Sequence, residues 1–251
     1  MDLQGNNGYR ISYSESGPPD CRTVIVAMHG FAGDKTSSCI RMLEKRANKM
    51  GLGLIKFNWP AHGDSETDGL HFTVDNCLSD LDSIIGYVKE KHPGCELVAF
   101  ATSFGGYLAL LYHYHHPGVF RHLILRSPAI RMSEVLDKHL LTEEMKAELR
   151  ERRCIEYGFE RMITVTDRLI DQIRANDVFR LYENSDLANV SIIHGTKDDV
   201  VPVSDSIEFA KLHGCSFYPV EGADHRYKKI GELDAVIDIA AHILETVSAT
   251  G

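Results

Sequence analysis

Short apolar runs alternate with longer amphipathic stretches along most of the chain. Each apolar run has the length of a strand and ends at turn residues, and the stretches between the runs repeat apolar residues at helical spacing. Strands that alternate with helices predict a mostly parallel, doubly wound α/β sheet with its active site at the carboxyl ends of the strands. The predicted strands are 9–13 (an edge strand), 23–28, 52–57, 97–101, 122–126, 190–194 and 215–220, and the predicted helices are about 36–50, 73–91, 106–116, 204–212 and 230–247.

The alternation breaks in residues 129–188. This segment is rich in Glu, Lys, Arg and Leu, and it shows helical or irregular character with no strand. Because it starts at the active-site edge of the predicted sheet, we expect a helical cap over the site, inserted in a single domain that spans 1–251. Extra helices packed on a distant face are the alternative. Tyr157 and Phe159 of this segment are candidates, with Arg126 and Ser127, for lining the acyl pocket, and the two aromatic residues are equally candidates for ordinary packing within the cap.

A serine lies on the predicted turn between strand 97–101 and the helix that follows it. In Ala101-Thr102-Ser103-Phe104-Gly105, small residues stand two positions before and two positions after the serine, as the strained turn of a nucleophile elbow requires. Such a turn lifts the serine Oγ above the sheet and leaves the next N–H free at a helix N-terminus. Alone, the pentapeptide also fits an ordinary strand end with a serine N-cap.

Two later loops supply an acid and a histidine. Asp198 follows strand 190–194 and His225 follows strand 215–220, so the chain order is Ser, Asp, His, which is the order of the α/β-hydrolase triad. A neutral His225 would take the Ser103 proton, and Asp198 would hold the imidazole in the productive tautomer. The distance from the strand end and the Asp-x-x-Val-Pro pattern favour Asp198 over its neighbour Asp199, which we expect to face solvent.

A glycine-containing turn follows strand 23–28, with the sequence His29-Gly30-Phe31-Ala32-Gly33. Acyl transfer places negative charge on a carbonyl oxygen, and fixed N–H donors aimed at that oxygen normally give the largest single gain in rate. We predict that the N–H groups of Phe31 and Phe104 form this oxyanion hole. A plain strand-ending turn is the alternative.

Taken together, these segments resemble the α/β-hydrolase superfamily along nearly the whole chain. The resemblance implies a triad of Ser103, Asp198 and His225, with oxyanion donors at Phe31 and Phe104. Within the superfamily the chain resembles the group of monoacylglycerol lipases, serine aminopeptidases and cinnamoyl or feruloyl esterases, and residues 157–178 resemble the cinnamoyl-esterase type of cap. The matching motifs are His29-Gly30-Phe31, Asn58-Trp59-Pro60-Ala61-His62-Gly63-Asp64-Ser65, Ala101-Thr102-Ser103-Phe104-Gly105-Gly106, His194-Gly195-Thr196-Lys197-Asp198 with Val201-Pro202, and Gly222-Ala223-Asp224-His225.

The chain departs from the family pattern at three places, none of which removes a catalytic group. They are Ala101 where the family usually has Gly, Asn58-Trp59-Pro60 where it often has Asp-x-Arg, and Asp224 where it often has Gly.

Composition narrows the choice of partners. The chain of 251 residues has 36 acidic and 27 basic residues and a formal charge of -9, which disfavours a nucleic-acid partner. The N-terminal residues lack the features of a secretion signal and no stretch approaches the length of a membrane span, so we expect a cytoplasmic protein with no membrane insertion. The six cysteines lack metal-site spacing, and His113, His115 and His116 do not converge on one ion, so we expect no metal and no cofactor.

The sequence therefore predicts a serine hydrolase that cleaves carboxylic esters of small acyl or aromatic acids through an acyl-enzyme on Ser103. We expect a small-molecule ester as its partner, and a homodimer stays open. The alternatives are a peptidase or thioesterase of the same fold, a carbon-carbon bond hydrolase and a non-catalytic ligand receptor.

Overall fold

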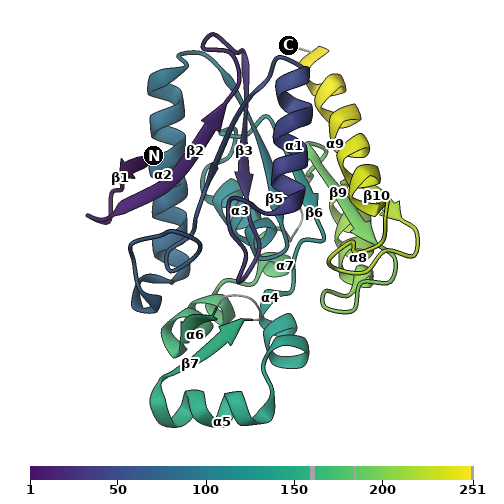
Figure 1. Cartoon of the computed structure of the whole chain (residues 1–251). Helices are drawn as coiled ribbons and strands as arrows, with labels where there is room; N and C mark the ends of the chain where they lie inside the picture. Colours follow the sequence, from purple (N-terminus) through teal and green to yellow (C-terminus); the bar gives the residue numbers. More distant parts are fainter. Residues whose placement is uncertain (159–161, 184, 250–251) are drawn as a thin grey trace.

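A central sheet runs through the protein in the computed structural model, which describes residues 1–158, 162–183 and 185–249 (Figure 1). In these residues the sheet has eight strands in the order β1-β2-β4-β3-β5-β6-β9-β10. Strands β1, β2 and β4 pair antiparallel, and all later neighbours pair parallel. Their bounds are β1 Asp2–Gln4, β2 Arg10–Ser16, β3 Thr23–Met28, β4 Gly53–Phe57, β5 Glu96–Thr102, β6 His122–Arg126, β9 Val190–Gly195 and β10 Ser216–Val220.

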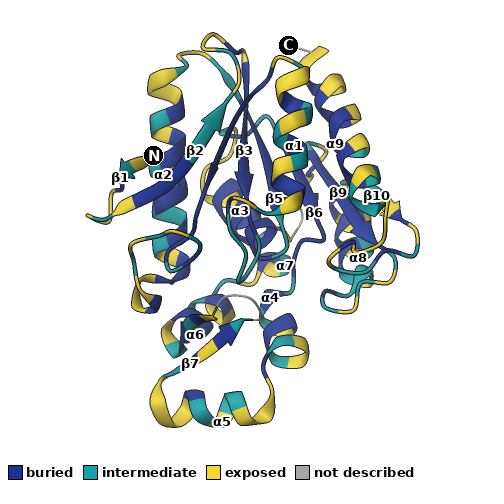
Figure 2. Cartoon of the chain, in the orientation of Figure 1, coloured by how far each residue is buried: buried dark blue, intermediate teal, exposed yellow. Residues whose placement is uncertain are grey.

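Helices cover both faces of this sheet. Helices α1 and α9 pack on one face, and α2, α3 and α8 pack on the other (Figure 1). Since both faces are covered, every residue of β3 and β4 is buried, and most of these residues are apolar (Figure 2). The bounds are α1 Ser38–Lys49, α2 Val74–Lys91, α3 Phe104–His115, α8 Val203–His213 and α9 Glu232–Ala249, with a short 3₁₀ helix at Gly69–His71.

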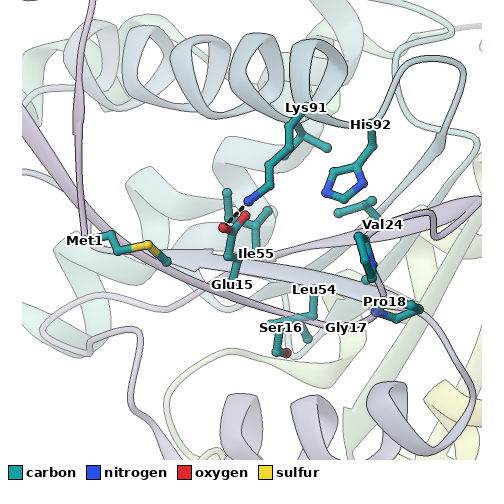
Figure 3. Close-up of a pocket in the computed structure, with 13 residues that line it drawn as sticks. Met1, Glu15, Ser16, Gly17, Pro18, Val24, Leu54, Ile55, Lys91 and His92 are labelled. Atoms are coloured by element: carbon teal, nitrogen blue, oxygen red, sulfur yellow. Dashed lines mark hydrogen bonds and ion pairs between the residues drawn. The ribbon is translucent and has the colours of Figure 1, made fainter.

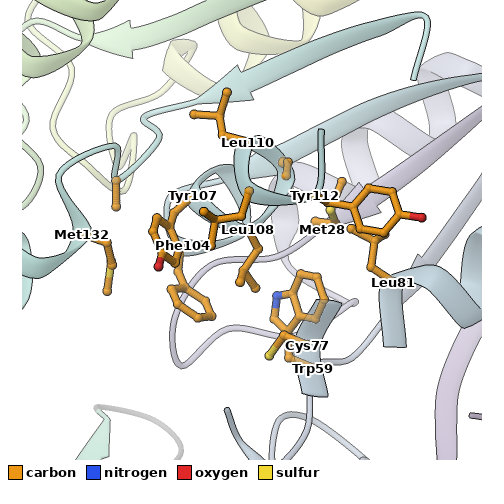
Figure 4. Packing of buried hydrophobic residues seen from close by; sticks show 14 of the residues in the cluster. Met28, Trp59, Cys77, Leu81, Phe104, Tyr107, Leu108, Leu110, Tyr112 and Met132 are labelled. Atoms are coloured by element: carbon orange, nitrogen blue, oxygen red, sulfur yellow. The ribbon is translucent and has the colours of Figure 1, made fainter. Parts of the chain in front are cut away.

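Helix α3 is the most deeply buried of these helices. Its residues from Phe104 to His113 are all buried, and its apolar side chains share one core cluster with Trp59 and with residues of α2 (Figure 4). Phe104 and Tyr107 stack with their ring centroids 5.9 Å apart. A helix that is apolar on all sides is stable only inside a protein, so this packing fixes the end of α3 that follows β5.

The predicted alternation of strands and helices is confirmed, but the prediction of 9–13 as an edge strand is wrong. Strand β2 lies between β1 and β4, and β1 forms the edge. With only three residues, β1 is too short for its alternation of polar and apolar positions to be recognised in the sequence. In the described part of the chain, every helix falls short of the length or the hydrophobicity that crossing a lipid bilayer requires.

After β6 the described residues 132–158 and 162–175 lie beyond the carboxyl ends of the parallel strands, and the chain then returns along α3, where the Tyr182 hydroxyl donates to the Leu110 carbonyl (Figure 1). The expectation that residues 129–188 hold no strand is wrong, because β7 and β8 form an antiparallel hairpin. Ile155 and Tyr157 alternate with polar residues in β7, but the strand is short and follows a highly charged helix, which hid the pattern. The elements are α4 Met132–Val135, a π-helical turn Leu136–Leu140, α5 Glu143–Arg152, β7 Cys154–Gly158, β8 Met162–Thr166, α6 Asp167–Ala175 and α7 Val178–Leu181.

Candidate active site

Ser103 occupies the sharp turn between β5 and α3 that the sequence predicts. Its backbone has φ 52° and ψ -114°, a conformation that is strained for any residue except glycine. Three hydrogen bonds hold it: the Ser103 N–H donates to the Arg126 carbonyl (3.0 Å), and the Ser103 carbonyl accepts from the N–H groups of Tyr107 (3.2 Å) and Ala129 (3.1 Å). The surrounding structure therefore maintains the strain and fixes the position of the side chain.

Close backbone contacts explain the small residues around this serine. A Cβ atom added at Gly105 would lie 2.5 Å from the His29 carbonyl oxygen, and one at Gly30 would lie 3.2 Å from the Ser103 Cβ. No real Cβ atom makes the first of these contacts, so glycine is required at position 105. The methyl group of Ala101, by contrast, is fully buried within the core cluster.

Hydrogen bonds connect Ser103 to His225 and His225 to Asp198. The His225 Nε2 lies 3.2 Å from the Ser103 Oγ, and the His225 Nδ1 lies 2.7 Å from the Asp198 Oδ2. Because the carboxylate accepts the Nδ1–H, the Nε2 is left to accept the serine proton. Asp199, in contrast, is exposed. The structure thus brings together the three side chains that the sequence singles out.

The Asp198 carboxylate is fully buried and accepts four hydrogen bonds. The Oδ2 accepts from His225 and from the Nε2–H of His194 (3.1 Å), while the Oδ1 accepts from the N–H groups of Val200 (2.9 Å) and Val201 (2.7 Å). Burial raises the pKa of Asp198, but hydrogen bonds from His194 and His225 outweigh burial and hold that pKa well below its usual range. Asp198 is therefore an anion near neutral pH.

His194 is a residue of the site that the sequence analysis placed at the end of a strand and in a family motif, without a role in the site. Its Nδ1 accepts a hydrogen bond from the Ser206 hydroxyl at 2.8 Å, which leaves the Nε2–H to donate to Asp198. The signal in the sequence was a histidine at the end of a buried strand, four positions before the acid. Nothing in the sequence of α8 indicates that Ser206 would contact His194.

The loop after β3 carries the first predicted oxyanion donor. The His29 Nε2 accepts from the Trp59 N–H (3.1 Å), so its Nδ1 carries the proton and donates to the Gly30 carbonyl (2.8 Å). In a trans peptide the C=O and the N–H point in opposite directions, so fixing the Gly30 carbonyl also fixes the direction of the Phe31 N–H. Trp59, one of the departures from the family pattern, also donates its indole N–H to the His29 carbonyl (3.0 Å).

A second buried histidine supports the same loop. The His62 Nε2 accepts from the Ala32 N–H at 3.1 Å, and its Nδ1–H donates to the Pro60 carbonyl at 2.8 Å. Burial lowers the pKa of His29 to about 3 and the pKa of His62 to about 4, so both side chains are neutral near pH 7.

The two predicted oxyanion donors, the N–H groups of Phe31 and Phe104, make no hydrogen bond within the described part of the protein. The Phe31 and Phe104 rings pack edge to face, with their centroids 5.4 Å apart, which holds the two segments together.

Phe31, Ser103 and His225 line a cavity of about 650 Å³. Part of its wall comes from the segment 129–188, including Tyr157, whose ring contacts the Phe31 ring with a centroid distance of 5.3 Å. Phe159 lies outside the described residues. Of the described residues in this segment, the apolar side chains that line the cavity are Met132, Val135, Leu140 and Tyr157.

A second cavity, of about 330 Å³, is lined by residues at the amino-terminal ends of β3 and β4 (Figure 3). Ser103 follows the carboxyl end of β5, so this cavity lies at the other end of the parallel strands. Its polar wall includes the ion pair between Glu15 and Lys91. Across residues 1–158, 162–183 and 185–249, no group of three or more His, Cys, Asp or Glu side chains is arranged to hold a metal ion.

Residues 19–189 match the family described as serine aminopeptidase, S33. The chain belongs to this family. Monoacylglycerol lipase ABHD6 of Homo sapiens is 26% identical over 95% of this chain and 81% of that protein. A monoacylglycerol lipase of Mycolicibacterium smegmatis is 26% identical over 50% of this chain, and the match spans 45% of that protein, less than half its length.

Solved structures show the same fold. Est1E from Butyrivibrio proteoclasticus, with ferulic acid bound, superposes with a TM-score of 0.83 at 19% identity and covers 99% of both chains. The sheet and its helices are therefore those of an α/β hydrolase. At the level of the family, these relatives support a hydrolase of carboxylic esters.

Proposed function

We propose that this protein hydrolyses carboxylic esters of small acyl or aromatic acids through an acyl-enzyme on Ser103. The observation that carries the proposal is the pair of hydrogen bonds that connects Ser103 to His225 and His225 to Asp198. Ser103 and His225 line a cavity that is also lined by Phe31. The Ser103 Oγ attacks the ester carbonyl carbon as the His225 Nε2 takes the hydroxyl proton. Asp198, held as an anion, stabilises the imidazolium that forms.

The tetrahedral intermediate places a negative charge on the former carbonyl oxygen. The N–H groups of Phe31 and Phe104, which have no hydrogen-bond partner among the described residues, stabilise that charge, and the neutral His29 keeps the first of them in place. His225 then protonates the departing alcohol, and the ester C–O bond breaks. Water, deprotonated by His225, attacks the acyl-enzyme in the second half of the cycle and releases the acid.

The segment 129–188 acts in this proposal as a cap that selects the acyl group. Its Met132, Val135, Leu140 and Tyr157 give the cavity an apolar wall, which suits a short aliphatic or aromatic acyl chain. Est1E, which has the same fold, binds ferulic acid, an aromatic acid. The relative ABHD6 is named as a lipase of monoacylglycerols, which are carboxylic esters.

The charges of the cavity disfavour an aminopeptidase, the activity for which the family is named. An aminopeptidase must bind the cationic amino terminus of its substrate, and a carboxylate normally provides that contact. Among the described residues that line the cavity, Arg126, Arg226 and Lys228 are cationic and Asp199 is the single carboxylate. An ammonium group would therefore meet repulsion on most sides.

Labelling with a fluorophosphonate and hydrolysis of chromogenic esters test the proposal. Ser103→Ala should abolish covalent labelling and reduce ester turnover by several orders of magnitude, on the order of 10⁶ where triads have been dissected. Ser204→Ala, at an exposed position on α8, is the control and should label like the unmodified protein. Labelling that survives in Ser103→Ala would show that another residue is the nucleophile.

A panel of esters then measures the acyl preference. The panel should include 4-nitrophenyl esters of increasing chain length, a methyl hydroxycinnamate, an acyl thioester and an aminoacyl anilide. We expect the short and aromatic esters to react fastest and the anilide slowest. A protein that never labels and hydrolyses none of these compounds would contradict the proposal and favour a ligand receptor.

A further inference from the structure

Arg126 is a buried cation beside the proposed nucleophile. It is the last residue of β6, it pairs with Thr102 of β5, and its carbonyl accepts the Ser103 N–H. Only 7% of the residue is exposed, although it carries a full charge. Burial of a charge is costly unless a carboxylate or several hydrogen bonds compensate for it, so the partners of this guanidinium decide what it does.

The partners in the protein leave the guanidinium unsatisfied. The Nη2 donates to the His225 carbonyl at 2.9 Å, and the group lies over the Tyr227 ring, 4.3 Å from its centroid. The Nε is buried without a hydrogen-bond partner, and no carboxylate of the described residues lies within 4.0 Å of the group. The Asp198 carboxylate is fully engaged with other donors, as described above.

The first turn of α1 lines the same cavity as Arg126. Ser37, Ser38 and Cys39 border it, and Ser37 at the N-cap makes no side-chain hydrogen bond to the helix. The first N–H groups of an α-helix lack partners within the helix and attract anions. The positive charge of Arg126 reaches Cys39, where it lowers the pKa of the thiol against the larger opposite effect of burial. The same cavity is therefore bordered by a guanidinium with a donor that lacks a partner and by the amino end of a twelve-residue helix. Both favour the binding of an anion there.

We propose that Arg126 and the first turn of α1 form an anion subsite that binds a carboxylate of the substrate. This inference rests on the proposed function and narrows the substrate to an ester that carries a free carboxylate a few bonds from the scissile carbonyl. The carboxylate belongs either to the acyl group, as in a half-ester of a dicarboxylic acid, or to the leaving alcohol. The guanidinium, which is itself buried, offers the carboxylate charge-assisted hydrogen bonds.

Matched pairs of substrates test the subsite. One pair places the charge on the acyl side: 4-nitrophenyl hydrogen glutarate and its neutral isostere, the 4-nitrophenyl ester of glutaramic acid. The other places it on the leaving group: the butyrate esters of 4-hydroxybenzoic acid and of 4-hydroxybenzamide. In one of the two pairs, kcat/KM should favour the carboxylate by roughly ten- to a hundredfold, the gain from one or two charge-assisted hydrogen bonds. The pair that shows the preference identifies the side that carries the anion.

Two variants separate binding of an anion from support of the His225 loop. Arg126→Gln should bring the charged-to-neutral ratio close to one, mainly through KM, whereas Arg126→Lys should keep part of it. If Arg126 only positions His225, both members of each pair should lose activity by the same factor, and that result would overturn the proposal. A ratio of one in the unmodified protein, in both pairs, would overturn it as well.

Binding of glutarate to Ser103→Ala, measured by calorimetry, tests the subsite without catalysis. We expect binding that weakens with added salt and disappears in Ser103→Ala/Arg126→Gln, with thermal unfolding used to verify that both proteins are folded. Retained glutarate binding in a protein that hydrolyses no ester would support the subsite and refute the hydrolase proposal. The opposite result is a protein that hydrolyses neutral esters but neither binds glutarate nor prefers the charged substrates. That result would support the hydrolase proposal and refute the subsite.

Discussion

Replacing His62 with glutamine should make the stability of the protein less sensitive to acid. The neutral His62 accepts the Ala32 N–H and donates to the Pro60 carbonyl, and a protonated imidazole cannot accept the first of these bonds. Burial lowers the pKa of His62 from 6.5 to about 4 in the folded protein. Between these two values the unfolded chain binds a proton that the folded chain does not, so the His62 contribution to stability is present above pH 6.5 and is lost as the pH falls toward 4.

The size of the effect follows from the same two pKa values. At pH 5.5, one unit below the unfolded pKa and above the folded one, the loss relative to pH 8 is roughly 1–2 kcal/mol. Glutamine does not titrate, so His62→Gln does not lose this part of its free energy of unfolding between pH 8 and pH 5.5. Groups that do not interact with His62, such as His122, also titrate in this range, but their contributions cancel when the variant is compared with the unmodified protein at each pH.

Urea unfolding followed by tryptophan fluorescence measures this difference. Trp59 is the single tryptophan of the chain and is fully buried next to His29, so its emission reports on the region that His62 supports. His62→Gln should be less stable than the unmodified protein at pH 8, and the gap should narrow by roughly 1–2 kcal/mol at pH 5.5. His242→Gln, at an exposed position on α9, controls for the loss of an imidazole as such. A gap that stays constant or widens on acidification would refute the argument that His62 is held neutral.

Three further outcomes are expected. Asp198→Asn should reduce turnover by about 10⁴ because it favours the wrong His225 tautomer, while Asp199→Asn should have little effect; equal losses in steady-state kinetics would contradict this. Burial raises the pKa of Asp80 to about 7, so its charge destabilises the fold increasingly as the pH rises from about 4 to 7. Asp80→Asn should therefore raise the melting temperature at pH 8 more than at pH 4.5. Tyr157→Ala should change the ranking of esters by acyl size more than the rate of fluorophosphonate labelling, and an unchanged ranking in a folded variant would argue against contact with substrate.

Local signals and chain order were enough to predict the position of the candidate site. The strained turn at Ser103 has a signature within five residues, and Asp198 and His225 each follow an apolar run that the sheet aligns with it. Because the carboxyl ends of parallel strands meet at one edge, placing the strands also placed these residues near one another.

Interactions that form only between distant elements were not predictable in the same way. The hydrogen bond from His194 to Asp198 depends on the hydroxyl of Ser206 in α8, and the unsatisfied guanidinium of Arg126 depends on which carboxylates are absent around it in space. Sequence patterns report the burial of one side chain but not the set of groups that surround it. The β7–β8 hairpin was missed for a related reason, since two short strands become recognisable only when they are paired.

The position of β9 makes the reactivity of Ser103 a measure of how completely the chain has folded. Strand β9 pairs with β6 only after the chain has passed through the whole of residues 129–188, and β10 then pairs with β9. Contacts between segments so far apart in sequence carry a high loop-closure entropy and tend to form late. The turn at Ser103 is local to β5 and α3, whereas Asp198 and His225 arrive with β9 and β10. During refolding, recovery of fluorophosphonate labelling should therefore lag behind recovery of helical circular dichroism.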